Sequence, residues 1–439
     1  MIGDDNYKYD FEDSNDHYWQ SNDFWGEYNK TKTEKAEKYN PSVEEKQKLL
    51  NLIQKEKTEE KKKIVKPHIN IGVIGHEGHG KTTVVKALLH STDPNNKLAK
   101  WRVKDINHTP TVDADSYEFE TAKLAVTCFD LPGSVRYTKN TFVGLSQLDA
   151  VILVIDASNG PMPQTREHII LARCAEVKNI IVYLNKTDLI KDDDLRDLVE
   201  METRDMLTQY EFNGDNVKII SGSAKRFLMG FESTTIKALL GEINKLEVPK
   251  RDDDSSFLMS ITKVISKSGG VVVTGTVKKG TLKQGEEVFV DGKTSIKCNS
   301  IQTFRRPITE AKAGENIAIL CEGLKPTDIT RGQVISKDNK VKLYSEFEAE
   351  VYVLSKDEGG RRTPFRSDYV PQFYFGAFDS PGKVEITAIK GKKSPFLAEP
   401  GENVSMKIKM LRPFILSKDM RVTIRDGQKT IGAGKVTKV

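Results

Sequence analysis

The chain has 439 residues and a mass of 49.3 kDa, a length that predicts two to four domains. Its 37% hydrophobic and 30% charged residues are typical of a globular protein and exclude a fibrous one. The net charge of +5 is too small to indicate a polyanionic partner by itself, and every apolar run is far shorter than the roughly 18 residues of a membrane span.

The cysteines and the first residues favour a cytoplasmic protein that does not enter a membrane. Cys128, Cys174, Cys298 and Cys321 lie too far apart for a CxxC metal pair and are too few for a disulfide framework. The chain opens with Met-Ile-Gly-Asp-Asp, without the basic and apolar succession of a secretory signal. We therefore expect a reduced, cytoplasmic setting.

Residues 1–66 form a tail with 15 acidic residues and 13 lysines, a net charge of −2. Its first 30 residues hold eight aromatic side chains without apolar periodicity, a composition typical of a disordered, solvated segment. The alternative is a segment whose aromatic side chains dock on a partner protein. A charged helix is expected from Ser42, because Ser42 and Glu45 form a capping box.

From residue 67 to 252, apolar runs alternate with amphipathic segments. The runs predicted as strands are Ile69–Ile74, Ala122–Phe129, Val151–Ile155, Ile180–Leu184 and Val217–Ile220. The segments predicted as helices are Thr82–Leu89, Gln164–Cys174, Asp193–Tyr210 and Thr234–Leu246. This alternation predicts an α/β domain in which a parallel sheet carries helices on both faces.

Beyond residue 252 the helical spacing ends, and short strand-like runs recur between turn pairs such as Lys279-Gly280, Asp291-Gly292 and Asp426-Gly427. Short strands at this spacing predict β-barrels or sandwiches. The remaining residues suit two small all-β barrels better than one, and we place these domains at residues 253–341 and 342–439.

The first strand leads into Gly75-His76-Glu77-Gly78-His79-Gly80-Lys81-Thr82, which fits the P-loop pattern G-x-x-x-x-G-K-[ST] between a strand and a helix. Glycines let backbone N–H groups turn toward phosphates, and Lys81 can reach the β and γ phosphates. The hydroxyl of Thr82 can bind Mg²⁺, and Thr83 follows it in the first turn of the helix, whose positive end favours an anion.

Three later segments complete a predicted guanine nucleotide site. Asp130-Leu131-Pro132-Gly133 follows a strand, where Asp130 can reach the metal through water and Gly133 can face the γ-phosphate. Asn185-Lys186-Thr187-Asp188 places a carboxylate where it accepts from the two N–H donors of guanine, which adenine lacks. Ser223-Ala224-Lys225 supplies further base contacts.

These motifs, together with Pro161–His168, Lys356–Arg361, Pro371–Phe375 and Gly432–Gly434, resemble the translational GTPases, in particular elongation factor Tu, over residues 67–439. The resemblance implies a GTP-binding domain at residues 67–252 followed by two barrels that together bind aminoacyl-tRNA. It further implies GTP or GDP with Mg²⁺ as cofactors, the ribosome and a nucleotide exchange factor as partners, and a monomeric chain.

The resemblance also assigns individual residues. Thr82 and Thr111 match the two Mg²⁺-binding threonines, with Asp130 acting through water. The matches to tRNA contacts are Lys139 and Asn140 for the 5′ end, Asp254, Phe257 and Asn316 for the aminoacyl-adenosine pocket, and Arg361 and Gln372 for the T-arm.

Several positions depart from the family. Ser134 stands where the family carries its catalytic histidine, and a serine hydroxyl has a shorter reach and no titration near neutral pH. The other departures are Glu77 and Pro110 in place of apolar residues, Gly78 in place of an aspartate, a shortened segment before Thr111, and Ser116 and Gln302 in the aminoacyl pocket. We therefore expect nucleotide binding to be retained and GTP hydrolysis to be weak.

Charge differs between the parts of the chain. Residues 67–252 carry a net charge of −3, whereas residues 253–439 carry 32 basic and 22 acidic residues, a net charge of +10. A basic barrel pair suits an RNA backbone, although lysines also serve simply to solvate a surface.

Two functions remain open on these grounds. The chain is either a factor that presents aminoacyl-tRNA or a related RNA to the ribosome, or a nucleotide-bound regulatory protein derived from such a factor. In the second case, its tail recruits a partner.

Overall fold

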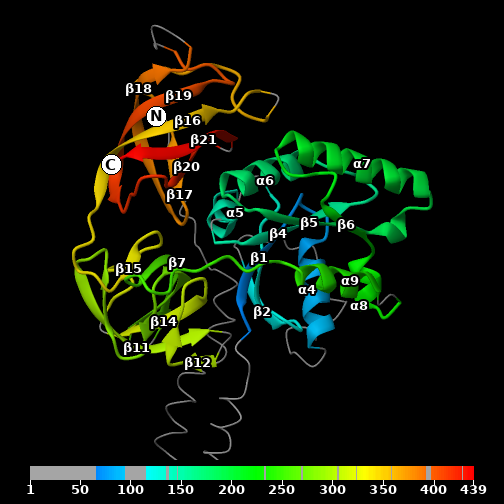
Figure 1. Ribbon diagram of the computed structural model, residues 1–439, viewed down its shortest axis with the longest axis horizontal. Helices are drawn as coiled ribbons and strands as arrows, with labels where there is room; N and C mark the ends of the chain where they lie inside the picture. The colour runs from blue at the N-terminus through cyan, green and yellow to red at the C-terminus, as the bar shows by residue number, and fades with distance from the viewer. Residues whose placement is uncertain are drawn as a thin grey trace, which may run out of the picture. The chain divides into compact units, whose positions relative to one another are not determined.

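The computed structural model describes residues 66–93, 115–134, 138–145, 147–231, 234–267, 270–303, 306–322, 324–356, 358–391, 397–427 and 429–439. Residues 1–65 of the tail, with its expected helix, and Pro110 and Thr111 lie outside these residues. Lys66–Val439 form one compact unit, in which an α/β domain is followed by two β-barrels (Figure 1).

The α/β domain is built on a six-stranded sheet with the order β2-β3-β1-β4-β5-β6. These strands are β1 (His68–Ile74), β2 (Asp115–Glu120), β3 (Ala125–Asp130), β4 (Ala150–Asp156), β5 (Asn179–Asn185) and β6 (Lys218–Ser221). All neighbouring pairs are parallel except β2 with β3. The five strands predicted from the sequence are therefore parallel as expected, and β2, which was not predicted, adds an antiparallel strand at the edge.

The edge of the sheet differs from the prediction in two places, β2 and the start of β3. In β2 two aromatic residues alternate with polar and acidic ones, a pattern of a half-buried antiparallel strand rather than of an apolar run. The strand predicted from Ala122 begins only at Ala125, because the backbone N–H of Thr121 donates to the carbonyl of Leu124 and closes a turn.

Helices cover both faces of this sheet (Figure 1). They are α4 (Lys81–Thr92), α5 (Thr138–Leu145), α6 (Pro163–Cys174), α7 (Asp193–Gln209), α8 (Ala224–Leu228) and α9 (Thr234–Ile243), with a 3₁₀ turn η3 (Thr187–Leu189). Strand β4 shows how the two faces are filled, because its side chains alternate between them. Val151, Leu153 and Ile155 pack in one apolar cluster with residues of α6 and α7, while Ile152 and Val154 pack in the other with residues of α4 and α9.

Each barrel closes around its own apolar core. The first has the order β10-β15-β7-β8-β14-β11 and closes through β10 with β11. Its strands are β7 (Leu258–Lys267), β8 (Gly270–Lys279), β10 (Glu287–Val290), β11 (Thr294–Thr303), β14 (Asn316–Glu322) and β15 (Val334–Ser336), with β12 (Arg306–Ile308) added beside β11 and a small pair formed by β9 (Leu282–Lys283) and β13 (Glu310–Ala311).

The second barrel closes in the order β16-β19-β18-β17-β20-β21. Its strands are β16 (Tyr344–Val353), β17 (Gln372–Phe375), β18 (Phe378–Ile389), β19 (Asn403–Phe414), β20 (Arg421–Asp426) and β21 (Lys429–Lys438). The fold predicted from the sequence, a P-loop α/β domain followed by two all-β barrels, is thus confirmed.

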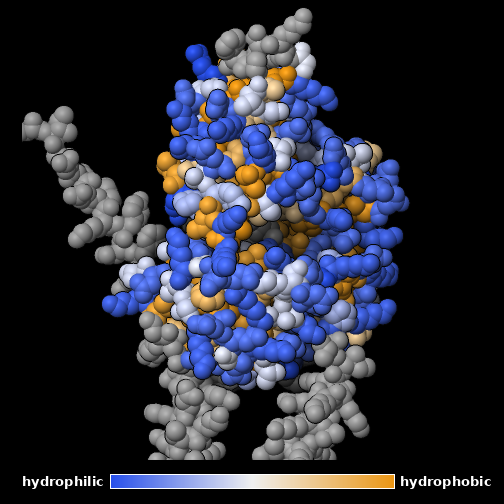
Figure 2. Space-filling view, turned by 60° about the vertical axis from the view of Figure 1, so that its left-hand side comes forward, coloured by the Kyte–Doolittle hydropathy of each residue, from blue (hydrophilic) through white to orange (hydrophobic). Residues whose placement is uncertain are grey.

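Polar contacts join the barrels to the α/β domain. Gln147 accepts from the hydroxyl of Thr276 in the first barrel at 2.5 Å, and Arg425 of the second barrel lies 3.2 Å from Glu167 in α6. The four cysteines are buried and have free thiols. Among the described residues no helix is long and apolar enough to span a membrane, and the face in Figure 2 is mostly hydrophilic.

Candidate nucleotide-binding site

The P-loop joins the end of β1 to the start of α4, and close contacts require glycine at two of its positions, Gly75 and Gly80. Gly75, Gly78 and Gly80 have backbone φ values of 137°, 81° and 91°, which residues other than glycine rarely adopt. A Cβ on Gly80 would lie 2.3 Å from the amide nitrogen of Asn185, and one on Gly75 would lie 2.2 Å from the carbonyl oxygen of Val154. The loop therefore packs directly against the ends of β4 and β5.

Lys81 lies at the centre of the predicted phosphate site. Its ammonium donates to the carbonyl of His76 at 3.0 Å, and the residue is 6% exposed. Burial lowers the pKa of Lys81 to about 8, although Asp130 and Glu77 act in the opposite direction. A Cβ on Gly133 would lie 2.1 Å from the Lys81 ammonium, so the D-x-x-G segment lies against the P-loop.

Thr82 and Asp130 form the predicted metal end of the site. The Thr82 hydroxyl donates to Asp130 Oδ2 at 2.6 Å. Burial raises the pKa of Asp130 to about 6, although the Thr82 hydrogen bond and Lys81 both lower it. Asp130 Oδ1 is buried without a hydrogen-bond partner in the described part of the chain. Hydroxyl and carboxylate oxygens of this kind fit Mg²⁺ and its water ligands, while Thr111 lies outside the described residues.

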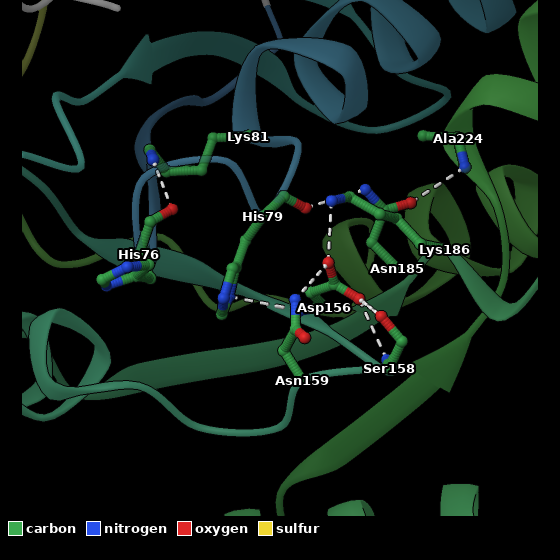
Figure 3. A network of polar contacts seen from close by, with 9 residues as sticks. All are labelled: His76, His79, Lys81, Asp156, Ser158, Asn159, Asn185, Lys186 and Ala224. Atoms are coloured by element: carbon green, nitrogen blue, oxygen red, sulfur yellow. Dashed lines mark hydrogen bonds and ion pairs between the residues drawn. The ribbon is translucent and has the colours of Figure 1, made fainter. Parts of the chain in front are cut away.

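The predicted guanine-binding segments also come together. The side chain of Asn185 donates to the carbonyl of His79 at 3.0 Å and accepts from the backbone N–H of Ala224 at 3.1 Å. It thereby ties the P-loop to the Ser223-Ala224-Lys225 segment (Figure 3). Asp188 is exposed in η3, so its carboxylate faces solvent and can accept from a base. Ser223 caps α8 by accepting from the backbone N–H of Arg226.

Two buried histidines support the loop, and the sequence analysis gave neither a supporting role. His168 Nδ1 accepts from the backbone N–H of Gly75 at 3.0 Å, and His79 Nδ1 accepts from that of Asp156 at 3.1 Å. Burial lowers the pKa of His79 to about 4 and that of His168 to about 3. Both rings are therefore neutral acceptors at neutral pH. The signal for His168 was its place at the end of the family-like stretch Pro161–His168.

Asp156 is a second residue that the sequence analysis missed. Its carboxylate lies 2.7 Å from the ammonium of Lys186, within the predicted base-binding segment. The strand pattern did not indicate a function for Asp156, because Asp156 is only the residue at which the apolar run of β4 ends. An acidic residue at the carboxyl end of a central parallel strand was the available signal, since ligands bind at that edge of such sheets.

The position expected to be catalytic is occupied by a half-buried Ser134 directly after Gly133. A Cβ on Gly133 would lie 2.8 Å from the backbone nitrogen of Glu77, so this segment runs beside the P-loop. Glu77 and Gly78 are exposed there. Residues 135–137 lie outside the described part of the chain.

The predicted tRNA 5′ contact lies where the α/β domain meets the first barrel. Asn140 in α5 accepts from the guanidinium of Arg331 at 3.2 Å, so Arg331 joins the predicted site although the sequence analysis did not single it out. The side chain of Lys139 is outside the described set. The available signal was a basic residue three positions before β15.

The other predicted RNA contacts occupy the two barrels separately. Asp254 is exposed, whereas Phe257 is 1% exposed and belongs to the core of the first barrel. Asn316 begins β14 and is half-buried. In the second barrel Arg361 stacks 4.8 Å from the ring centre of Tyr369, and Gln372 donates to Asp379 at 2.6 Å.

Comparison with known families gives three matches in chain order. Residues 66–250 match the elongation factor Tu GTP binding domain. Residues 270–336 match elongation factor Tu domain 2, and residues 340–439 match the elongation factor Tu C-terminal domain. The first match covers the six-stranded sheet and its P-loop, the second covers the first barrel from β8 to β15, and the third covers the second barrel.

Proposed function

The chain belongs to the translational GTPase family and carries the domains of elongation factor Tu, and from this premise we propose that it binds aminoacyl-tRNA or a related RNA for ribosomal protein synthesis. Guanine nucleotide binding follows from its GTP-binding domain. The observation that supports the RNA proposal is the Asn140–Arg331 contact, because it joins a residue proposed to bind the tRNA 5′ end to a barrel pair with a net charge of +10.

We assign the nucleotide contacts to the residues of the converging motifs. They are Gly75, His76, Glu77, Gly78, His79, Gly80, Lys81, Thr82, Thr83, Asp130, Gly133, Asn185, Lys186, Asp188, Ser223, Ala224 and Lys225. Thr82 and Thr111 would hold Mg²⁺, with Asp130 acting through water. The ion supplies positive charge to the phosphates when bound, and Lys81 adds its ammonium beside them.

The remaining assignments are part of the same proposal. We place the domains at residues 1–66, 67–252, 253–341 and 342–439, and the chain in the cytoplasm as a monomer with a nucleotide exchange factor. Lys139, Asn140, Asp254, Phe257, Asn316, Arg361 and Gln372 are the proposed tRNA contacts. The tail is proposed to bind a protein partner.

Protection of the aminoacyl ester tests the RNA proposal. The full chain, loaded with GTP or GDP, is incubated with aminoacyl-tRNA, and hydrolysis of the ester bond is followed over time. We expect slower hydrolysis with GTP than with GDP, because the family binds charged tRNA in the GTP form. Equal hydrolysis with GTP, with GDP and without protein would refute the proposal.

We further propose that GTP hydrolysis is weak, because Ser134 cannot act as the family histidine does. Multiple-turnover hydrolysis with ribosomes should be far below that of an elongation factor Tu control, and Ser134→His should raise it. Ser134→Ala is the matched control and should leave the rate near that of the wild type. A wild-type rate equal to that of the control factor would remove this proposal.

A second function, a nucleotide-bound regulatory protein, is favoured by the same position. The exposed Glu77 is part of the P-loop, and Ser134 follows Gly133, which lies beside that loop. Weak hydrolysis at these positions would leave the chain in its GTP form. This alternative gains support if the ester is not protected while guanine nucleotide binding is tight.

A further inference from the structure

Asp156 is the centre of a hydrogen-bond network at the edge of the nucleotide site (Figure 3). Its side chain is 2% exposed, and Oδ2 accepts from the ammonium of Lys186 at 2.7 Å. Asn159 also donates to Oδ2 at 3.1 Å. Oδ1 accepts from the backbone N–H of Ser158 at 2.9 Å and from its hydroxyl at 2.6 Å. Of the four residues in this network, only Lys186 belongs to a nucleotide-binding motif.

The carboxylate remains charged in this environment. Burial by itself would raise the pKa of Asp156, but the hydrogen bonds from Lys186 and Ser158 outweigh it and leave the pKa below its usual value. The network therefore presents an anion to Lys186 at neutral pH. A buried charge of this kind is stable only while its partners stay in place.

The Asp156–Lys186 contact lies at a backbone turn with an unfavourable conformation. Lys186 has a φ of 62°, a left-handed conformation that costs free energy for a lysine. Asp156 lies directly opposite Asn185 in the parallel pairing of β4 with β5, and the backbone N–H of Ala157 donates to the carbonyl of Asn185 at 2.9 Å. The strand end and the carboxylate together hold the turn that leads to Asp188.

We propose that Asp156 is a positioning residue for guanine. It holds the ammonium of Lys186, so that the aliphatic part of Lys186 forms a fixed wall of the base pocket and Asp188 faces the ring edge. The inference rests on guanine nucleotide binding and not on the proposed RNA binding or hydrolysis. Because the contact is in the base-binding segment, it supports GTP and GDP equally.

Release of ribose-labelled fluorescent GDP and GTP from the full chain tests this role. Asp156→Asn should accelerate dissociation of both nucleotides roughly 10-fold, the effect of losing a hydrogen bond to a charged group. The matched control is Asp149→Asn at the other end of β4. Asp149 is 6% exposed and pairs with Arg251 at 2.6 Å, so its loss should leave release unchanged.

A second pair of variants separates positioning from general stability. In a Lys186→Met chain, Asp156→Asn should no longer accelerate release, because the partner through which it acts is already gone. Ser158→Ala removes one hydrogen bond to the same carboxylate and should accelerate release by about 2-fold to 3-fold. This variant replaces Asp156→Asn as the test if Asp156→Asn fails to fold.

Three outcomes would overturn the inference. They are unchanged release in Asp156→Asn, the same acceleration with and without Lys186, and equal acceleration by Asp149→Asn. A wild-type chain that binds neither labelled nucleotide would instead refute the nucleotide site itself, which distinguishes the two failures.

Discussion

The two ends of the central sheet carry similar polar residues with different surroundings. At the amino end of β4, Asp149 accepts from the backbone N–H of Asn70 and from Arg251, and Asn70 donates to the carbonyl of Gly314 in the first barrel. At the carboxyl end, Asp156 pairs with Lys186. Each end thus has a buried aspartate and a basic partner, and at the amino end the neighbouring Asn70 is also bonded directly to the first barrel.

The difference lies in which polar atoms have partners. Near the carboxyl end, His76 Nδ1, His79 Nε2 and Asp130 Oδ1 are buried without hydrogen-bond partners among the described residues. Such atoms cost stability unless a ligand satisfies them. The ion pair of Asp149 with Arg251 at the amino end therefore stabilises the fold. The ion pair of Asp156 with Lys186 at the carboxyl end instead positions residues that bind a ligand.

The strongest test of this contrast changes the amino end. Arg251→Met leaves the buried Asp149 carboxylate without its closest cation, so we expect the free energy of unfolding to fall by about 3 kcal/mol, with nucleotide affinity unchanged. Urea unfolding and nucleotide titration measure the two quantities. Arg173→Met, which removes an exposed pair with Glu211, is the control and should cost less than about 1 kcal/mol. A large loss of nucleotide affinity in Arg251→Met would break the contrast.

The second test changes the carboxyl end. Asp188→Asn should lower GTP affinity by about 100-fold, or about 2.7 kcal/mol, and shift preference toward xanthine nucleotides, because the amide no longer accepts from both guanine donors. Competition binding of GTP against xanthosine triphosphate measures the shift. Asp205→Asn, an exposed carboxylate on α7, should change neither affinity. Unchanged GTP binding in Asp188→Asn would contradict the base contact.

The smallest expected effect is a pH dependence shared by both ends. Burial lowers the pKa of His68 at the amino end to about 4 and that of His168 at the carboxyl end to about 3, from 6.5. Because the folded values are lower, the unfolded chain binds the proton more strongly. The stability is complete above pH 6.5 and is lost as the pH falls toward 3 or 4.

Each of these histidines should contribute up to about 1.4 kcal/mol per pH unit to that loss. His68→Gln and His168→Gln should each flatten the dependence of unfolding free energy on pH between 6 and 5 by that amount. A slope that stays the same in both variants would show that these rings bind protons equally in the folded and unfolded chain, which would contradict the lowered pKa values.

The sequence predicted those parts of the molecule that local chemistry determines. The P-loop was predictable because positive φ values at Gly75 and Gly80 demand glycine, and β4 and β5 were predictable because both faces are buried and the strands are continuously apolar. The antiparallel β2 was not, because its direction depends on pairing with β3, which follows it in the chain.

The supporting residues of the site escaped prediction for the same reason. Asp156 and Lys186 are separated by 30 residues, and His168 meets Gly75 across 93. Such contacts arise only when parallel strands align and α6 packs beside the P-loop. No periodicity or motif in one sequence encodes these distances.

The edges of the sheets have a consequence for how the chain behaves at high concentration. An uncovered edge strand offers backbone groups to a second molecule and promotes intermolecular pairing. Both barrels avoid this by closing on themselves, and the six-stranded sheet ends in the four-residue β6 and in β2, where Asp115, Glu118 and Glu120 repel an identical strand. The architecture therefore opposes strand-mediated aggregation at both borders of its open sheet.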